Sequence, residues 1–548
     1  MIQPLGDPPQ AASSAPTFIC QIDNAVHDAH AIFGFGWALD RAGTIVRGTL
    51  RLQFGDGRVS SVRLSMERAR EDVAAAFPDY PQAAHAGFMF MAGWGEEAPE
   101  RAELVFEMAD GGLQCTALDL LGHLPSANGS TRAAERRYLF RRALAHLRQG
   151  RIGELFHKVL RQVRQRTKPA DASDRTLAAA LKGRRCRLVI DHSMGGGANL
   201  FRERVVSSWV AEGDTVVLLS FRLATMVPFI EVLQRKHKLV LTLQRLDELI
   251  GILADATLTE IFFNCAVSFP RVEQVQHLVM ALKRRFGTRL VVAMHEYFLV
   301  CPSPFLLDSK GQFCGVPSMD RCQTCLPEHE DGFVSLAGER SIERWRMMWG
   351  EALEAADEVR CFSESTRHLL ARAYPFITGR MTLRPHPIEP LRPIRPPRRE
   401  RACLTVGVIG SILQHKGAQV VADLAKAIVD AGANIRIVVV GNIDACCPPE
   451  VVEQTGPYRR DALPDLVEQH RIDIALLPSI CPETFSFVAH EIVSIGLPLL
   501  CLDLGAQADL ARSLRAGWVS SRQDGPGLLQ ELIAFDRHLK PLRLKVLT

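Results

Sequence analysis

The stretch IDIALLPSICPETFSFVAHE, residues 472–491, places a short apolar run, a loop and an amphipathic segment in direct succession. Residues 472–478 are typical of a strand buried on both faces of a parallel sheet. The segment after Thr484 predicts the start of a helix, whose positive end favours phosphate. Glu483 and Glu491 would lie about two turns apart on nearly one face of that helix. Such a strand, loop and helix suit a nucleotide-sugar.

Short apolar runs alternate with predicted helices from about residue 184 onward. This alternation is typical of doubly wound, Rossmann-like α/β domains. Residues 385–401, rich in Pro and Arg, are predicted to be an interdomain hinge. Two such domains, 184–390 and 391–548, would therefore face each other across a cleft. The predicted strands are residues 186–190, 215–220, 239–243, 260–264, 290–294 and 358–362, then 404–409, 435–440, 472–477 and 498–502.

The N-terminal part of the chain has a different pattern of apolar and polar residues. Short alternating runs separated by turns such as Asp56-Gly57 predict a small all-β sandwich domain at residues 1–125. Gly36-Trp37-Ala38-Leu39-Asp40, followed by Asp72-Val73, Phe77-Pro78 and Gly87-Phe88, resembles a small β-sandwich that is often attached to bacterial polysaccharide enzymes. Two roles stay open for it, docking or spacing on the one hand and carbohydrate binding on the other. The predicted strands include residues 44–54, 58–64, 87–91 and 101–108.

A basic helical linker is predicted at residues 126–183. Its segment 132–166 is rich in arginine and carries apolar residues at roughly helical spacing. A basic amphipathic helix can lie on an anionic membrane surface, which would make the protein peripheral on the inner membrane. The alternative is a solvated helix that packs its apolar stripe on a neighbouring domain.

Composition sets limits on the class of protein. A length of 548 residues is enough for three domains, and a net charge of +4 implies no nucleic-acid partner. No signal peptide and no membrane-spanning run is recognised, so a cytoplasmic location is expected. In that compartment the fourteen cysteines would be thiols or metal ligands and not disulfides.

Three loops are predicted to face the cleft because each follows a predicted strand. Gly195, Gly196 and Gly197 remove side chains before a helix, so that backbone amides can approach a ligand, although a tight structural turn is the alternative. His295 follows the strand at 290–294 and could hydrogen-bond a sugar hydroxyl. The third loop, residues 410–417, carries Lys416, whose ammonium group suits a pyrophosphate.

Residues 187–518 resemble the GT-B-fold glycosyltransferases of the large retaining type, family 4. The specific part of the resemblance is the spaced pair Glu483 and Glu491 together with Gly496-Leu497-Pro498. The further matching elements are Gly195–Gly197, His295-Glu296-Tyr297, Ser363 with Thr366, the Gly410 loop with Lys416, and Gly456-Pro457-Tyr458.

The resemblance implies roles for individual residues. Lys416 would bind the donor diphosphate, Glu483 would contact hydroxyls of the transferred sugar, and Glu491 would hold the nucleotide ribose. His295 would lie near the sugar and is grouped with Glu483 and Lys416 as catalytic. The implied donor-binding set is Gly196, Gly197, Ser411, Thr484, Phe485, Ser486 and Glu491, with backbone amides of residues 484–486 on phosphate.

The mechanism implied by the resemblance needs no catalytic metal and names no protein base, because the leaving phosphate itself deprotonates the acceptor. The sequence departs from the family where an arginine often precedes the lysine, since residues 412–415 contain none. His415 could replace that cation only if it were protonated.

A separate group of cysteines lies in a loop rich in Pro and Gly. Cys301, Cys314, Cys322 and Cys325 fall within twenty-five residues, and the last two form a tight pair. Four thiols so close together predict a structural zinc site, with free thiols as the alternative.

The sequence as a whole predicts a retaining glycosyltransferase that uses a UDP- or GDP-sugar and extends a polysaccharide or lipid-linked glycan. Two other hypotheses stay open: a nucleotide-sugar 2-epimerase of GT-B form, and a catalytically inactive glycan-binding scaffold.

Overall fold

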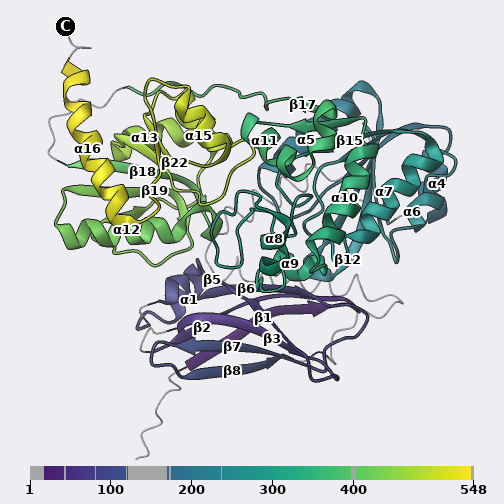
Figure 1. Cartoon of the computed structure of the whole chain (residues 1–548), viewed down its shortest axis with the longest axis horizontal. Helices are drawn as coiled ribbons and strands as arrows, with labels where there is room; N and C mark the ends of the chain where they lie inside the picture. The colour runs from purple at the N-terminus through teal and green to yellow at the C-terminus, as the bar shows by residue number, and fades with distance from the viewer. Residues whose placement is uncertain are drawn as a thin grey trace, which may run out of the picture.

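The computed structural model describes residues 18–41, 45–80, 82–118, 120, 170–171, 174–235, 237–395 and 403–544. The predicted basic segment 132–166 lies outside these residues. Three units are visible in Figure 1: an all-β region in purple and, above it, two α/β lobes in teal and yellow-green. None of the helices in these ranges is both long and apolar enough to cross a bilayer.

The all-β region consists of two four-stranded antiparallel sheets in the orders β1-β2-β6-β5 and β4-β3-β7-β8. Phe88 from one sheet and Leu50 and Phe106 from the other belong to one buried core, as their alternating apolar pattern requires. The predicted all-β N-terminal region is therefore confirmed. Its strands are β1 (Phe18–His27), β2 (Ala31–Asp40), β3 (Ile45–Gln53), β4 (Val59–Arg63), β5 (Ser65–Arg68), β6 (Gly87–Gly93), β7 (Arg101–Met108) and β8 (Leu113–Leu118), with the short helix α1 (Glu71–Ala76) between β5 and β6.

The first α/β lobe, called here the N-lobe, is built on a nine-stranded sheet in the order β17-β16-β15-β14-β10-β11-β12-β13-β9. Its strands are β9 (Ala170–Asp171), β10 (Arg185–Ile190), β11 (Thr215–Arg222), β12 (Val227–Leu233), β13 (Lys238–Thr242), β14 (Thr257–Phe263), β15 (Arg289–Ala293), β16 (Glu358–Cys361) and β17 (Met381–Leu383). Its helices are α4 (Asp174–Leu181), α5 (Gly197–Glu212), α6 (Glu248–Ile252), α7 (Glu273–Phe286), α8 (Met319–Cys325), α9 (Gly332–Ala337), α10 (Ile342–Ala355) and α11 (Glu364–Ala373).

One part of the N-lobe departs from the predicted alternation of strand and helix. β11 pairs with β12, and β12 with β13, in antiparallel fashion, so this edge is a meander and not a strand–helix–strand unit. Phe229, Ile230 and Val232 of β12 are buried, and a three-residue 3-10 turn, Leu223–Thr225, joins this strand to β11. The six predicted N-lobe strands are present with shifted ends.

The second α/β lobe, the C-lobe, has a six-stranded, all-parallel sheet in the order β20-β19-β18-β21-β22-β23. Core residues of α12 and α16 cover one face, and those of α13, α14 and α15 cover the other, which is the predicted doubly wound arrangement. The strands are β18 (Leu404–Ile412), β19 (Ile435–Ile443), β20 (Val452–Gln454), β21 (Ile474–Leu477), β22 (Leu499–Leu502) and β23 (Gly517–Ser520). The helices are α12 (Ala418–Ala431), α13 (Leu463–His470), α14 (Phe487–Ser494), α15 (Gly505–Arg512) and α16 (Gly525–Leu544).

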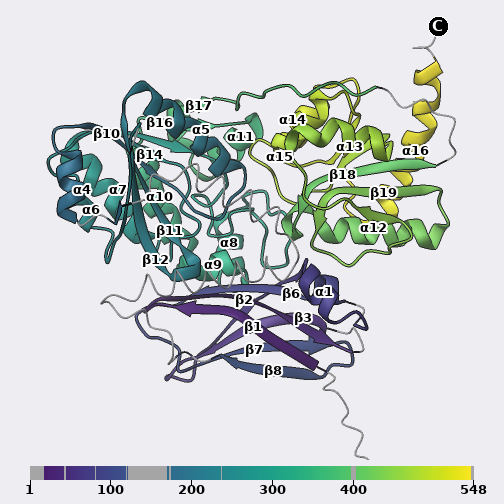
Figure 2. The same ribbon diagram turned by 180° about the vertical axis from the view of Figure 1, so that it is seen from behind.

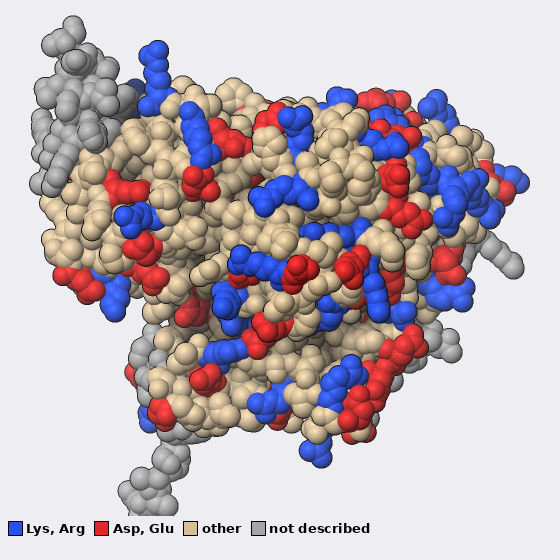
Figure 3. All heavy atoms as spheres, in the orientation of Figure 1, with Lys and Arg blue, Asp and Glu red and all other residues tan. Residues whose placement is uncertain are grey.

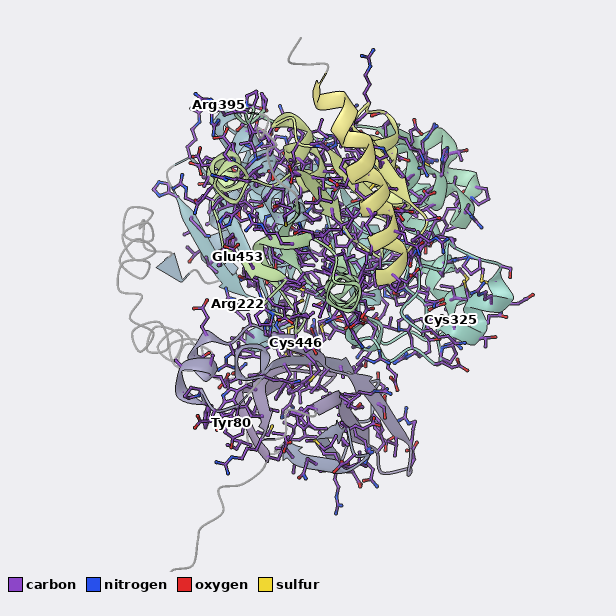
Figure 4. All side chains as sticks on the ribbon, turned by 90° about the vertical axis from the view of Figure 1, so that its left-hand side faces the viewer. Tyr80, Arg222, Cys325, Arg395, Cys446 and Glu453 are labelled. Carbon is purple, nitrogen blue, oxygen red and sulfur yellow. The ribbon has the colours of Figure 1, made fainter. Side chains whose placement is uncertain are left out.

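The all-β region contacts both lobes and lies below them in both views of the ribbon (Figures 1 and 2). On the N-lobe side, Arg63 N donates to Glu330 O at 2.8 Å, and the Arg47 side chain pairs with the Glu330 carboxylate. On the C-lobe side, the Glu67 carboxylate hydrogen-bonds the backbone of Cys446, which is labelled at this boundary in Figure 4. Burial at this contact raises the pKa of Glu67.

Charged side chains of both signs are interspersed over the face in Figure 3. Blue and red spheres alternate across the lobes and the all-β region, which agrees with the net charge of +4. Among the described residues on this face, no broad surface of a single sign is seen.

Candidate active site

An ion pair lies at the carboxyl end of the C-lobe sheet. Lys416 Nζ is 2.7 Å from Glu483 Oε1. β18 and β21 are neighbours in the sheet, so the loops that follow them, with Lys416 in one and Glu483 in the other, meet at the same edge. Ser479 Oγ donates a further hydrogen bond to Glu483 Oε1 at 2.7 Å. Two residues that are 67 positions apart in the sequence are thus brought together by the parallel sheet.

Both members of this pair stay ionised around neutral pH. Burial alone would raise the pKa of Glu483, but the Lys416 charge and the hydroxyls of Ser479 and Ser486 outweigh it and hold that pKa below its usual value. Burial alone would lower the pKa of Lys416, but the Glu483 charge raises it above its usual value. The site therefore presents a fixed ammonium group and a fixed carboxylate side by side.

Close backbone contacts hold the two loops in place. A Cβ at Gly417, whose φ is +87°, would lie 2.0 Å from Pro478 O, and a Cβ at Gly505 would lie 2.5 Å from Glu483 N. The fully buried Gln507 accepts from Glu483 N and donates to Cys481 O, both at 3.2 Å. Gln507 was not predicted from the sequence. Gly505, two residues earlier, is the position whose missing side chain could have indicated this close contact with the backbone of Glu483.

Helix α14 begins at Phe487, two residues later than predicted. Glu483 therefore lies in the loop before the helix, and the expectation that Glu483 and Glu491 share a helix face is wrong. The chain turns at Ser486, directly before the helix. Ser486 is not glycine, yet its backbone is in the left-handed region, with φ +62° and ψ 79°. No hydrogen-bond acceptor among the described residues takes up the amides of Thr484, Phe485 or Ser486.

Glu491, at the other side of this loop, forms its own ion pair. Arg460 Nε donates to Glu491 Oε1 at 2.6 Å, and the Arg460 side chain also donates to Glu389 O in the interdomain segment. Burial raises the pKa of Glu491 above its usual value, and Arg460 opposes that shift. Arg460 was not predicted, although it lies two residues beyond the Gly456-Pro457-Tyr458 element.

The N-lobe meets this loop at His295, which follows β15. Thr484 Oγ1 donates to His295 O at 2.8 Å, so the hydroxyl predicted to lie at the helix end is engaged across the cleft. The His295 ring stacks on Phe362 and His386, with centroids 4.5 and 5.4 Å away, and its buried Nε2 has no partner among the described residues. Burial, with His386 and His192, holds the pKa of His295 well below its usual value, so the ring is neutral.

The glycine loop of the N-lobe precedes α5 as predicted. Gly195 and Gly196 have φ values of +89° and +90°, which explains glycine at both positions. A Cβ at Gly197 would lie 3.0 Å from the Phe487 ring, so this loop faces the start of α14 in the C-lobe. Ser411 is exposed near the end of β18, on the strand that leads to the Lys416 loop.

The suggestion that His415 supplies a second cation is wrong. The His415 ring stacks on Phe305 with a centroid distance of 3.9 Å and an interplanar angle of 7°. Burial and the adjacent Lys416 charge lower the pKa of His415 to about 3, so the ring is neutral at physiological pH. The missing arginine is therefore not replaced by this residue.

Of the four cysteines of the predicted zinc site, Cys301 and Cys314 lie in the segment between β15 and α8, and Cys322 and Cys325 lie on α8. Each of Cys314, Cys322 and Cys325 contributes to raising the pKa of Cys301, after burial as the main cause, so the thiols lie near one another. Figure 4 shows sulfur atoms around the labelled Cys325. Within the described ranges, however, no three of these sulfurs lie within 4.8 Å of one another.

Glu296 lies beside a polar group formed by Asp191, His192 and Cys265, whose ligand atoms are within 4.8 Å of one another. Burial raises the pKa of Glu296 to about 8, a hydrogen bond with Cys265 opposes the shift, and the Asp191 charge adds to it. Asp191 itself accepts hydrogen bonds from three donors: Asn199 Nδ2, His192 N and Arg202 Nη1, at 2.7, 2.9 and 3.0 Å.

Replacing Glu296 by glutamine is expected to stabilise the protein at alkaline pH. Since folding raises this pKa from 4.5 to about 8, the native state holds a proton that the unfolded state releases, and stability is lost as pH rises through that window. The gain of Glu296→Gln over wild type should grow between these pH values by at most about 1.4 kcal/mol per unit. Calorimetric unfolding from pH 4.5 to 8.5 measures it, and a pH-independent difference would contradict the assignment.

Comparison with known proteins agrees with this geometry in the C-lobe. Residues 403–535 match the family model described as glycosyl transferases group 1. A search of the curated proteins finds no match. Among solved structures, HepE of Anabaena with UDP-glucose has 13% identity and a TM-score of 0.40, and covers 65% of this chain and 90% of its own. A glycosyltransferase of Rickettsia africae has 10% identity and a TM-score of 0.41, and covers 65% and 89%.

These structural likenesses are distant, so no property of either protein is transferred to this chain. The predicted fold, two Rossmann-like α/β domains after an all-β region, is observed directly. The matched residues 403–535 span the whole C-lobe sheet, β18 to β23, and with it the Lys416–Glu483 pair. The C-lobe is therefore similar to the glycosyl transferases group 1 family over residues 403–535.

Proposed function

We propose that this protein is a retaining glycosyltransferase of the family 4 type. It transfers a sugar from a UDP- or GDP-sugar to a polysaccharide or a lipid-linked glycan. The observation that carries the proposal is the Lys416–Glu483 pair, 2.7 Å apart, next to the amides of residues 484–486, which have no acceptor in the described part of the chain. An ammonium group, free amides and a carboxylate in one place match a phosphate joined to a polyhydroxy ring.

The chemistry follows from the charges that develop. The bond between the anomeric carbon and the phosphate oxygen breaks, and its electron pair stays on the nucleoside diphosphate. Lys416 and the amides before α14 stabilise that negative charge, and they are held in place before the reaction begins. The acceptor hydroxyl then bonds to the anomeric carbon on the same face, and its proton goes to the leaving phosphate.

Other residues position the donor. Glu483 accepts hydrogen bonds from hydroxyls of the transferred sugar, and Glu491, on α14, accepts those of the ribose. Arg460 holds the Glu491 carboxylate at 2.6 Å in the orientation this needs. Gly196, Gly197 and Ser411 line the approach, and His295 lies near the sugar. The 2.8 Å hydrogen bond from Thr484 to His295 O links the two lobes at this point.

Calorimetric titration with UDP, GDP, ADP and CMP tests the proposal. We expect UDP or GDP to bind with a dissociation constant in the micromolar range, about −8 kcal/mol, and CMP to bind more weakly because it lacks the second phosphate. The bound nucleotide should also raise the unfolding temperature by mass action. Absence of binding by all three diphosphates would reject the proposal.

No catalytic metal takes part in the proposed reaction, but a structural zinc ion is proposed for Cys301, Cys314, Cys322 and Cys325. About one zinc ion per chain is expected in protein purified under reducing conditions, because a structural zinc ion takes four ligands. Cys322→Ser should lower that content and the unfolding temperature, while Cys115→Ser, an exposed cysteine of the all-β region, should change neither. Wild-type protein without zinc would end this proposal.

The all-β region and the basic segment 132–166 also have roles in the proposed function. The all-β region acts as a docking or spacer β-sandwich, and its contacts with both lobes support that role. The proposed domain boundaries follow residues 125, 183 and 390. The protein would be cytoplasmic and would contact the inner membrane through the basic segment 132–166.

A further inference from the structure

The loop that carries Lys416 is a single short turn. Residues 414–416 form a 3-10 turn, in which Lys416 N donates to Leu413 O at 2.9 Å and Gly417 N donates to Gln414 O at 3.0 Å. Such turns have poorer hydrogen-bond geometry than an α-helix, so contacts from outside the turn decide where its side chains lie. The two residues before Lys416 both make contacts of this kind.

Gln414 fixes the turn to the loop that follows the neighbouring strand. Its Nε2 donates to Asp444 O at 2.7 Å, and Asp444 N donates to Ile412 O at 2.9 Å. Asp444 directly follows β19, which lies beside β18 in the C-lobe sheet. Its side chain is only 8% exposed. A shift of Asp444 would therefore be passed directly to the turn.

The all-β region faces the Asp444 side chain. Burial raises the pKa of Asp444, Arg68 and His85 oppose that shift, and Glu67 adds to it, so these three residues of the all-β region lie close to the carboxyl group. Glu67 also hydrogen-bonds the backbone of Cys446, the residue labelled at this boundary in Figure 4. Its φ is +58°, a conformation that a non-glycine residue keeps only where surrounding contacts hold it.

His415 links the turn to the all-β region by a second route. Its ring stacks on Phe305 at 3.9 Å, and Phe305 meets Phe333 of α9 edge-on with a centroid distance of 5.9 Å. Helix α9 lies directly on β6, because a Cβ at Gly332 would be 2.9 Å from Met91 Cγ. Close packing of this kind transmits small displacements from one segment to the next.

We infer that the all-β region positions Lys416 for the donor diphosphate, with Arg68 and Phe305 as positioning residues. Arg68 acts through the loop after β19, and Phe305 acts through His415. The two routes begin on β5 and β6, which are neighbours in one sheet, and they end on adjacent residues of the turn. The inference rests on the proposed function, because Lys416 is the proposed phosphate ligand. It gives the all-β region a part in donor binding, beyond docking or spacing.

Calorimetric titration with UDP and GDP tests this inference. Arg68→Ala and Phe305→Leu should each raise the dissociation constant about three- to thirtyfold, the range of coupling carried by packed side chains. Phe305→Tyr keeps the aromatic ring and should bind as wild type does. Arg51→Ala is the matched control for Arg68→Ala: Arg51 pairs with Glu103 at 2.9 Å on the other sheet of the all-β region, and its loss should leave affinity unchanged.

A double-mutant cycle separates positioning from a general loss of structure. In a Lys416→Ala background, Arg68→Ala should have little further effect on affinity, because the group that Arg68 positions is gone. A purely structural loss would instead add to the effect of Lys416→Ala. Wild-type affinity in both Arg68→Ala and Phe305→Leu, or additive effects in the double variant, would overturn the inference.

Hydrogen–deuterium exchange of the free protein distinguishes failure of this inference from failure of the proposed function. Without nucleotide, the amides of residues 413–417 should exchange faster in Arg68→Ala than in wild type or Arg51→Ala, whereas those of β22 should exchange equally in all three. Wild-type protein that binds neither UDP nor GDP would reject the proposed function. Faster exchange at residues 413–417 would then still support positioning of the Lys416 turn by the all-β region, and equal exchange would overturn it.

Discussion

Glu483→Gln is expected to lower kcat by about 10²-fold, the loss typical of one preorganised polar group at a reacting centre. Glutamine has the shape of glutamate but lacks its charge, so it neither fixes Lys416 at 2.7 Å nor accepts equally from sugar hydroxyls. Ser479 and Gln507 still hold the loop through their own hydrogen bonds. Initial rates with UDP- and GDP-sugars, with and without a glycan acceptor, measure the change.

Glu453→Gln is the matched control for this substitution. Glu453 lies on β20, with a half-exposed side chain, and pairs with Arg436 at 3.8 Å on the same sheet but away from the Lys416 loop. Its side chain is labelled in Figure 4. Its replacement should leave kcat unchanged. Near-normal turnover by the Glu483→Gln variant, with unfolding temperatures equal in both variants, would remove Glu483 from the proposed site.

Lys416→Ala is expected to weaken the binding of UDP or GDP by about 1.5–3 kcal/mol, the range for a hydrogen bond to a charged group. This corresponds to a dissociation constant about 10- to 150-fold higher. The ammonium group is the fixed positive charge of the loop, because His415 next to it is neutral. Calorimetric titration measures the change, and raising the salt concentration should reduce the difference, since the Lys416 side chain is 34% exposed.

The control for this charge is Lys426→Ala. Lys426 is an exposed residue of α12, the helix that begins two residues after Lys416. Its replacement removes the same charge from the same lobe but not from the loop. Unchanged nucleotide affinity in both variants would mean that Lys416 does not bind the diphosphate, and equal weakening in both would mean that only the net charge of the lobe matters.

The regular parts of both lobes could be predicted from local sequence. Strands such as residues 404–412 and 435–443 are buried on both faces, and a continuous apolar run between turn-forming residues indicates such a strand directly. The β11–β12 meander was missed because the short, mostly apolar run at residues 227–233 was not counted among the predicted strands, and periodicity alone does not identify so short a run. That meander also forms one side of a cavity of about 390 Å³, which helix α5 and the Gly195–Gly196 loop also line.

Part of the candidate site could be predicted from the sequence. The loop residues Lys416 and Glu483 stand directly after apolar strands, and the order of such strands in a parallel sheet puts their ends together. The start of α14 was misplaced because Ser486 takes a left-handed conformation that residue type does not favour, and such strain is set by the surrounding contacts. Arg460 and Gln507 could not be assigned, because their partners lie 31 and 24 positions away.

The sequence by itself determined most of the strands, the all-β character of the N-terminal region, the α/β character of the two lobes, and which polar residues follow each strand. These features depend on hydrophobic periodicity and on local turns, which act over a few residues. The tertiary structure alone decided the ionisation of His415 and Glu296, the pairing of Lys416 with Glu483 and of Arg460 with Glu491, and the cavity beside α5. The physical reason is that burial and electrostatic pairing depend on distances between segments far apart in the chain, and only packing of the lobes sets those distances.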